Sequence, residues 1–203
     1  SQCLAQAGRK CGGSVRGRRF VSAPTHARPL RRGFLAGLSL ACLGAGALLA
    51  WWRTRPVAGD DAAAVETFFS ARWNDAEGRA FDTAPLKGRP LVINFWATWC
   101  PPCVEEMPEL ELLHSELSPS GIQIVGIGID SEAKIRQFSE KHRFSYPLLP
   151  AGASGAELTR AFGNQTAALP FTVVIGPDGR IRQRILGRFR LDELRRVARA
   201  AAS

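Results

Sequence analysis

The sequence predicts an α/β domain, in which helices flank a central β-sheet. Residues 91–96 are mostly β-branched or aromatic, which is typical of a strand buried on both faces. Apolar residues then recur at three- and four-residue steps over 104–117 and predict an amphipathic helix. A second strand over 122–129 and a helix over 131–143 complete a strand–helix–strand–helix order, which is typical of α/β folds.

Two shorter strands are expected ahead of residue 91. Residues 53–64 are rich in Pro, Gly, Ala and Asp and are expected to form a linker. Residues 65–73 and 79–83 flank the turn-forming stretch 74–78, and this arrangement predicts a pair of strands around a turn.

Helices and strands continue through the rest of the chain. The first long helix is expected at 101–117, with a kink at Pro108, and Ser131 is expected to cap the next one. The remaining expected elements are an extended segment at 146–150, a helix at 154–162, strands at 171–175 and 181–186 joined by a turn at 176–179, and a helix at 191–202.

Positive charge is concentrated near the N-terminus. Residues 1–59 contain ten of the 27 basic residues and no acidic one, which leaves 17 basic against 18 acidic residues in the remainder. The formal net charge of +9 is therefore a property of the tail. Nucleic-acid binding by the folded part is not supported, because it depends on concentrated basic charge.

Residues 33–52 have the composition of a membrane-spanning helix. They carry no charge, end in two tryptophans, and are long enough to cross a hydrocarbon layer about 30 Å thick. Eight basic residues precede the segment and two follow it closely, which predicts a cytoplasmic N-terminus. We expect a disordered basic tail at 1–32, a single-pass signal anchor at 33–52, and a folded domain at 65–203 outside the cytoplasm.

Two alternatives remain for this apolar segment. Arg31 and Arg32 ahead of it resemble a twin-arginine export signal, for which residues 62–64 could serve as the cleavage site. Cys42 suggests a lipid attachment site, although the apolar run continues for ten residues beyond it. All three interpretations export the folded domain.

Cys100 and Cys103 lie where the strand at 91–96 meets the following helix. A helix N-terminus supplies unpaired amide donors and the positive end of the helix dipole, both of which favour a thiolate. We expect Cys100 to be the exposed nucleophile and Cys103, one turn inside the helix, to attack a mixed disulfide formed at Cys100. The two-residue spacer also allows the two sulfurs to form a disulfide.

Both spacer residues are prolines, Pro101 and Pro102. Proline suits the first helical turn, where its missing amide would have no intrahelical partner. It also removes two donors from the surroundings of the Cys100 sulfur. We therefore expect a less acidic Cys100 thiol and a less oxidising disulfide than a spacer with free amides would give.

A structural zinc site and an inert disulfide are the alternatives for this pair. Zinc needs about four ligands, and the predicted domain offers only His114 and His142 besides the pair. Cys3 and Cys11 lie in the basic tail and are expected to be free thiols, with zinc binding as the alternative. The sequence thus predicts redox chemistry and no metal.

The chain resembles the thioredoxin superfamily, and within it the membrane-tethered TlpA-like, ResA-like and CcmG-like thiol-disulfide reductases. The resemblance covers about residues 65–202 and rests mainly on the sequence Asn-Phe-Trp-Ala-Thr-Trp-Cys-Pro-Pro-Cys at 94–103. Glu-Glu-Met-Pro at 105–108, Leu-Pro at 169–170 and Gly-Pro-Asp-Gly at 176–179 add to it. It implies a thioredoxin-like fold, a central mixed sheet flanked by helices, here preceded by the anchor.

The resemblance also implies further site residues. Leu169 and Pro170 would join through a cis peptide whose loop faces Cys100 and binds the backbone of the partner protein. Trp99, Pro101 and Pro102 would also touch the partner. Thioredoxin itself has a buried Asp where this chain has Asn94, and the TlpA-like proteins instead carry a glutamate in the helix, which matches Glu106. Such a carboxylate would raise the thiol pKa values and could accept a proton from Cys103.

The expected function is reduction of disulfides in exported proteins, on the outer side of a bacterial inner membrane, that is, in the periplasm. Cys100 attacks, Cys103 resolves, and no soluble cofactor is needed. The resemblance implies a membrane electron donor that relays electrons from cytoplasmic thioredoxin. It also implies apocytochrome c as the usual client, in cytochrome c maturation, with general disulfide repair as the next candidate.

Three other functions are weighed against this one. The same fold could act as an oxidant that forms disulfides, because the sequence does not fix the reduction potential. A peroxiredoxin-like peroxidase would require Pro at position 93 and Thr or Ser at 97, where this chain has Ile93 and Ala97. A binding module without redox activity is the third.

Overall fold

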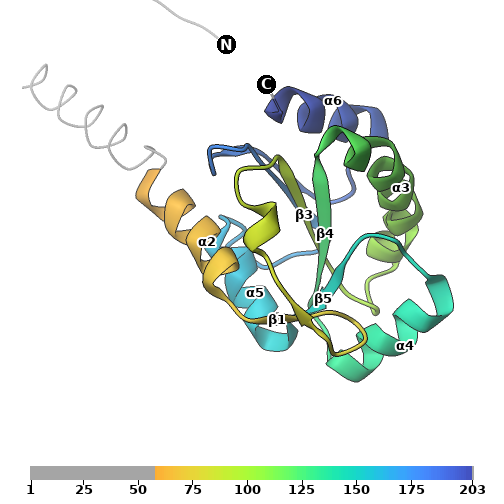
Figure 1. Cartoon of the computed structure of the whole chain (residues 1–203). Helices are drawn as coiled ribbons and strands as arrows, with labels where there is room; N and C mark the ends of the chain where they lie inside the picture. Colours follow the sequence, from red (N-terminus) through yellow and green to blue (C-terminus); the bar gives the residue numbers. More distant parts are fainter. Residues whose placement is uncertain (1–57, 203) are drawn as a thin grey trace, which may run out of the picture. The chain divides into compact units, whose positions relative to one another are not determined.

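A five-stranded mixed β-sheet is the centre of the computed structural model, which describes residues 58–202 (Figure 1). Its strands lie in the order β5-β4-β3-β6-β7. β3, β4 and β5 run parallel, whereas β6 and β7 pair antiparallel to their neighbours. The strands are β3 (Leu91–Trp96), β4 (Gln123–Gly128), β5 (Leu148–Pro150), β6 (Phe171–Ile175) and β7 (Ile181–Leu186).

β3 occupies the middle of the sheet, and all six of its residues are buried. Successive side chains of a strand point to opposite faces. Val92 and Trp96 accordingly pack in one core cluster, and Leu91, Ile93 and Phe95 in the other. Asn94 lies between Val92 and Trp96 in this alternation, so its amide points into the same layer as theirs.

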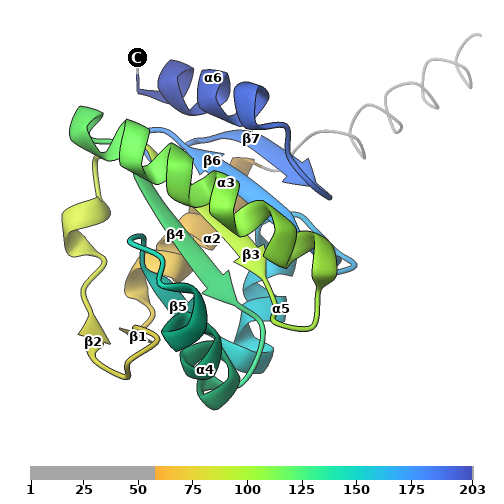
Figure 2. The ribbon, with the colours of Figure 1, turned by 90° about the vertical axis from the view of Figure 1, so that its right-hand side faces the viewer.

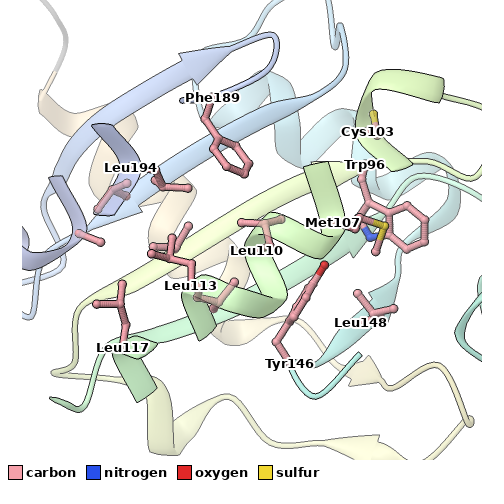
Figure 3. Packing of buried hydrophobic residues seen from close by; sticks show 14 of the residues in the cluster. Trp96, Cys103, Met107, Leu110, Leu113, Leu117, Tyr146, Leu148, Phe189 and Leu194 are labelled. Carbon is pink, nitrogen blue, oxygen red and sulfur yellow. The ribbon is translucent and has the colours of Figure 1, made fainter. Parts of the chain in front are cut away.

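Helices α3 (Pro101–Leu117) and α6 (Leu191–Ala201) cover the face toward which Val92 and Trp96 point (Figure 2). α4 (Glu132–His142) contributes Ile135 to the same core. Figure 3 shows how the apolar side of α3 meets Trp96 and Phe189. The buried residues of α3 in this layer are Cys103, Met107, Leu110, Leu113 and Leu117.

The opposite face of the sheet is covered by α2 (Ala58–Ser70) and α5 (Gly152–Ala161). Phe68 and Phe162 from this layer are completely buried. The Phe95 ring from β3 stacks on Phe171 and meets Phe162 in a tilted arrangement. Each face of β3 is thus sealed by its own helix pair, which explains why its sequence contains no exposed position.

The predicted strand at 65–73 is wrong, because residues 65–70 form the second half of α2 and only Trp73 belongs to a strand. Val65 and Phe68 are one helical turn apart and both enter the core. The helix ends at Ser70, beyond which the indole N–H of Trp73 donates to the Phe68 carbonyl at 2.8 Å. The chain then forms a two-stranded sheet of two-residue strands, β1 (Trp73–Asn74) and β2 (Ala80–Phe81).

The other predicted elements are confirmed, with small changes at their ends. α3 has the predicted bounds and continues through Pro108. Ser131 caps α4, its hydroxyl accepting from the Lys134 amide. α5 begins two residues earlier than predicted. Two short 3-10 helices, η1 (Ala84–Leu86) and η2 (Ser118–Ser120), connect the larger elements.

The basic tail, the predicted anchor at 33–52 and the first residues of the predicted linker lie outside the described residues. The described residues begin at 58, inside the predicted linker and seven residues before the predicted start of the domain. In the part from 58 to 202, none of the helices has both the length and the apolar character needed to cross a bilayer.

Candidate active site

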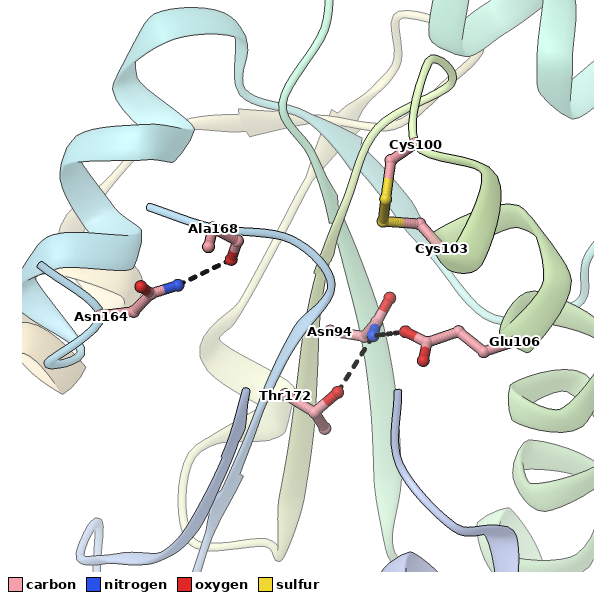
Figure 4. Close-up of a disulfide and its surroundings, with 7 residues drawn as sticks. All are labelled: Asn94, Cys100, Cys103, Glu106, Asn164, Ala168 and Thr172. Atoms are coloured by element: carbon pink, nitrogen blue, oxygen red, sulfur yellow. Dashed lines mark hydrogen bonds between the residues drawn. A yellow bond between two sulfur atoms is a disulfide. The ribbon is translucent and has the colours of Figure 1, made fainter. Parts of the chain in front are cut away.

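A disulfide between Cys100 and Cys103 closes the first turn of α3 (Figure 4). Cys100 is the N-cap residue with an extended backbone, and Pro101 and Pro102 occupy the first two helical positions. The carbonyl of Cys100 accepts from the amides of Cys103 at 3.0 Å and Val104 at 3.1 Å. The prolines thus occupy positions where they cost the helix no hydrogen bond.

The predicted open exposure of Cys100 is wrong for this disulfide form, in which Cys100 is only 4% exposed. The reason is that its sulfur is bonded to the fully buried Cys103 and packs in the core layer with Trp96 and Ala97. Cys100 is still more exposed than Cys103, which is completely buried. Trp99 beside it is 62% exposed, one of three large apolar side chains that face solvent in the described region.

Leu169 and Pro170 are joined by a cis peptide, as the resemblance implies. Pro170 is buried and Leu169 half-buried. Because Phe171 pairs with Phe95, this loop lies at the same end of the sheet as Cys100. The side-chain amide of Asn164 donates to the Ala168 carbonyl at 2.8 Å and holds the loop from the other side.

Glu106 lies one turn beyond Cys103 and is completely buried. Its Oε1 accepts a 2.7 Å hydrogen bond from Asn94 Nδ2, which also donates to Thr172 Oγ1 at 3.1 Å. Figure 4 shows the three side chains converging below the disulfide from α3, β3 and β6. Glu106 Oε2 and Asn94 Oδ1 have no hydrogen-bond partner among the described residues.

The pKa of Glu106 is raised to about 7. Burial is the main cause, because the ionised carboxylate loses its hydration, and the charge of Glu109 adds to it. The hydrogen bond from Asn94, the dipole of the nearby Phe189 backbone amide and the charge of Arg188 lower the pKa in turn. Glu106 can therefore exchange a proton near neutral pH, close to the buried Cys103.

A second polar contact fixes the loop that carries Cys100. Thr98 Oγ1 donates to Asp130 Oδ2 at 2.5 Å, and Asp130 Oδ1 also accepts from the Ser131 amide at 2.8 Å. Burial alone would raise the pKa of Asp130, but the hydrogen bonds from Thr98 and Ser131, together with the ion pair to Lys134, outweigh it and the pKa is lowered. The active-site loop is thus anchored to the start of α4.

The structure brings together the predicted cysteines, Glu106 and the Leu169–Pro170 loop, and it exposes Trp99 and Pro101 at their edge. Sequence reasoning missed Thr172, Thr98 and Arg188. Thr172 pairs with Asn94 across β3 and β6, and a strand register of this kind is not readable from one sequence. Within residues 58–202, no three His, Cys, Asp or Glu side chains are grouped as metal ligands.

Comparison with known proteins places this arrangement in a family. The family model described as Redoxin matches residues 58–200. The chain belongs to the Redoxin family. It is similar to the thiol-disulfide oxidoreductase ResA of Bacillus thuringiensis subsp. konkukian, with 30% identity over 114 residues. It is also similar to the ResA of Oceanobacillus iheyensis, with 34% identity over 110 residues.

The Bacillus match covers 56% of this chain and 64% of the relative, and the Oceanobacillus match covers 54% of this chain and 55% of the relative. This chain therefore spans less than two thirds of the length of each relative. Among solved structures, it resembles a thiol:disulfide interchange protein of the thioredoxin family from Chlorobium tepidum TLS, with 27% identity and a TM-score of 0.57. That match covers 64% of this chain and 92% of the Chlorobium chain.

A thioredoxin-related protein from Neisseria meningitidis serogroup B has 30% identity and a TM-score of 0.56, with 64% and 97% coverage. The predicted thioredoxin-like fold and the resemblance to ResA-like proteins are confirmed.

Proposed function

We propose that the protein is a thiol-disulfide oxidoreductase that reduces disulfides in exported proteins. The observation that carries the proposal is the Cys100–Cys103 disulfide at the start of α3, at the same end of the sheet as Pro170. Relatives named thiol-disulfide oxidoreductase support it. The described structure corresponds to the oxidised state that remains after a client has been reduced.

The reaction begins from the reduced dithiol. The Cys100 thiolate attacks one sulfur of the client disulfide, so that a mixed disulfide forms and the other client sulfur leaves as a thiolate. The Cys103 thiolate then attacks the Cys100 sulfur, which releases the second client thiolate and forms the Cys100–Cys103 disulfide. Two electrons pass to the client, and a dithiol donor must restore the pair before the next cycle.

Glu106 is the proton acceptor for Cys103 in this proposal. Cys103 is fully buried, so water cannot readily take its proton. A carboxylate whose pKa is raised to about 7 binds that proton much more strongly than an exposed glutamate would. Because the carboxylate is negative when ionised, it also raises the pKa of a nearby thiol, which keeps Cys103 protonated until Cys100 has reacted.

The client binds across the exposed end of the site. Trp99 and Pro101 present apolar surface to solvent beside Cys100, and Pro102 and Leu169 are half-buried behind them. The family resemblance implies that the Pro170 loop faces the Cys100 sulfur, and proline has no amide to donate to that sulfur. An extended client segment can lie along this rim with its cystine at Cys100.

The location and the partners of the protein are part of the same proposal. The apolar composition of residues 33–52 supports a single-pass anchor in a bacterial inner membrane, with the catalytic domain in the periplasm. Export through a cleaved twin-arginine signal would give the same compartment. A membrane protein that relays electrons from cytoplasmic thioredoxin is the proposed donor, and apocytochrome c is the proposed client.

Two measurements test the proposal. The reduction potential of the Cys100/Cys103 couple, measured in glutathione buffers, should lie well below the value of about −120 mV found for a strong oxidant. A potential near that value would favour the disulfide-forming direction instead. Cys103→Ser should trap a disulfide-bonded test peptide at Cys100, whereas the matched Cys100→Ser should trap none.

The choice of peptide addresses the client. A peptide with the haem-attachment spacing Cys-x-x-Cys-His, oxidised to its disulfide, should be reduced faster than a peptide of the same composition with more widely spaced cysteines. Equal rates would argue for general disulfide repair.

A further inference from the structure

A short connection between β7 and α6 crosses the active-site end of α3. We call residues 187–190 the strap. The amide of Gly187 donates to the Pro170 carbonyl at 2.8 Å, so the strap begins at the client-binding loop. Phe189 is buried in the same layer as Cys103 and Met107 (Figure 3). The strap is therefore fixed on both sides of Arg188, by Gly187 before it and by Phe189 after it.

Arg188 binds two carboxylates on the outside of α3. Its Nη1 lies 3.1 Å from Glu105 Oε2, and its Nη2 lies 3.2 Å from Glu109 Oε1. Glu105 and Glu109 are four residues apart and therefore neighbours on the helix surface, on either side of Glu106 in the sequence. The guanidinium thus spans the helical turn whose inner side carries the buried Glu106.

The energy of these ion pairs does not explain the arrangement. The Arg188 side chain is 44% exposed and that of Glu105 is 62% exposed. Ion pairs with this much exposure stabilise a fold by about 0–1 kcal/mol, and the burial of Phe189 already holds the strap down. What the two carboxylates add is a fixed position for one positive charge.

We propose that Arg188 is a positioning residue of the active site, which Glu105 and Glu109 hold against α3 so that one positive charge stands at the helical turn that carries the buried Glu106. The inference rests on the proposed function, because it concerns the group that takes the proton of Cys103.

The other groups around Glu106 agree with this assignment. Burial raises its pKa most strongly, and Arg188 is the charged residue that opposes this effect, while Glu109 on the same helix adds to it. Tyr146, whose own pKa is raised by burial and by the charges of Glu111 and Glu106, stays neutral. Asn94 and Thr172 contribute hydrogen bonds without charge.

The test is a titration of the Glu106 carboxyl carbon by ¹³C NMR in the oxidised protein, where the two cysteines do not titrate. In Arg188→Gln, the Glu106 carboxylate should bind its proton at least twofold more tightly than it does in the wild type. Arg188→Lys keeps the charge and should restore more than half of the difference. Glu109→Gln removes a negative charge and should shift the affinity in the opposite direction.

Arg195→Gln is the matched control. Arg195 forms the same kind of ion pair with Glu116 on α3, with Nε and Oε2 2.9 Å apart, but Glu116 is ten residues, or about 15 Å, from Glu106 along the helix. The Arg195→Gln substitution should therefore leave the Glu106 titration unchanged. As a second readout, the rate at which Cys103 attacks a mixed disulfide is measured against pH. In Arg188→Gln, the midpoint of this profile should rise in pH by the same amount as the midpoint of the Glu106 titration.

A change of less than twofold in Arg188→Gln, a decrease, or an equal change in Arg195→Gln would overturn the inference. The titration is carried out on the resting disulfide and needs no client. It therefore gives its answer even if the protein reduces no disulfide, and a failure of the proposed function would appear separately as a lack of trapping by Cys103→Ser.

Discussion

The buried Glu106 should make the oxidised protein less stable as the pH rises. The pKa of this carboxyl is 4.5 in an ordinary setting and about 7 in the folded protein. Each tenfold difference in proton affinity is worth about 1.4 kcal/mol, so ionising Glu106 costs the fold about 3 kcal/mol. The unfolded chain binds fewer protons than the folded one between these two values, and stability therefore falls as the pH rises through them.

The experiment compares urea denaturation of the wild type and Glu106→Gln, both as disulfides, from about pH 4 to about pH 8. Glutamine does not ionise, so the free energy of unfolding of the wild type should fall by about 3 kcal/mol relative to the variant, mainly between pH 4.5 and about 7, and level off above. Glu157→Gln, at a site on α5 away from the disulfide, controls for the loss of one negative charge and should follow the wild type.

Parallel stability curves for the wild type and Glu106→Gln would refute the reasoning. They would mean that water reaches the carboxyl in solution, or that it is not enclosed by Asn94 and the strap. A difference that grows with rising pH in favour of the wild type would be still more damaging, because it has the wrong sign for a buried acid.

Three further predictions test other parts of the structure. Asn94→Ala removes the 2.7 Å hydrogen bond to Glu106 Oε1 and should raise the pKa of Glu106 above about 7 in the ¹³C titration, with Thr172→Val producing a smaller rise; a fall in either variant would contradict this. Phe68→Ala should lower the free energy of unfolding by about 3–5 kcal/mol, because Phe68 anchors α2 in the core. Phe69 is only half-buried, so Phe69→Ala should lower it less. Equal, small losses in urea denaturation would mean that α2 does not pack as described. Gly126→Ala would place a Cβ 2.8 Å from Leu148 Cδ2 and 3.1 Å from Trp96 Nε1, so we expect a loss of about 1–3 kcal/mol in urea denaturation; wild-type stability would show that both side chains can move aside.

Much of the fold could be predicted because local patterns and tertiary packing agree around the active site. The apolar run of β3 and the three- and four-residue spacing of α3 are each explained by a single buried surface. The prediction at 65–73 was wrong because it relied on the turn-forming stretch at 74–78, which suggested a strand on each side of it. Val65 and Phe68 instead have helical spacing and meet the same core layer.

The site was only partly predictable, for a different reason. The cysteine spacing and the neighbouring Glu106 are local features, and one helix places them. The hydrogen bond between Asn94 on β3 and Thr172 on β6 joins residues 78 positions apart, and it depends on the register of the two strands and on the face of the sheet to which each side chain points. The near-complete burial of Cys100 likewise depends on how the loop packs against Trp96 and Ala97.

The alternation along β3 has a consequence for how such a domain can change over evolution or be redesigned. One strand supplies apolar side chains to both layers and aims the amide of Asn94 at Glu106. Inserting or deleting one residue between Leu91 and Asn94 would turn this amide toward α2 and α5 and bring an aliphatic side chain against Glu106. The acidity of the redox site can thus be tuned by exchanging side chains, whereas the length of its central strand is locked.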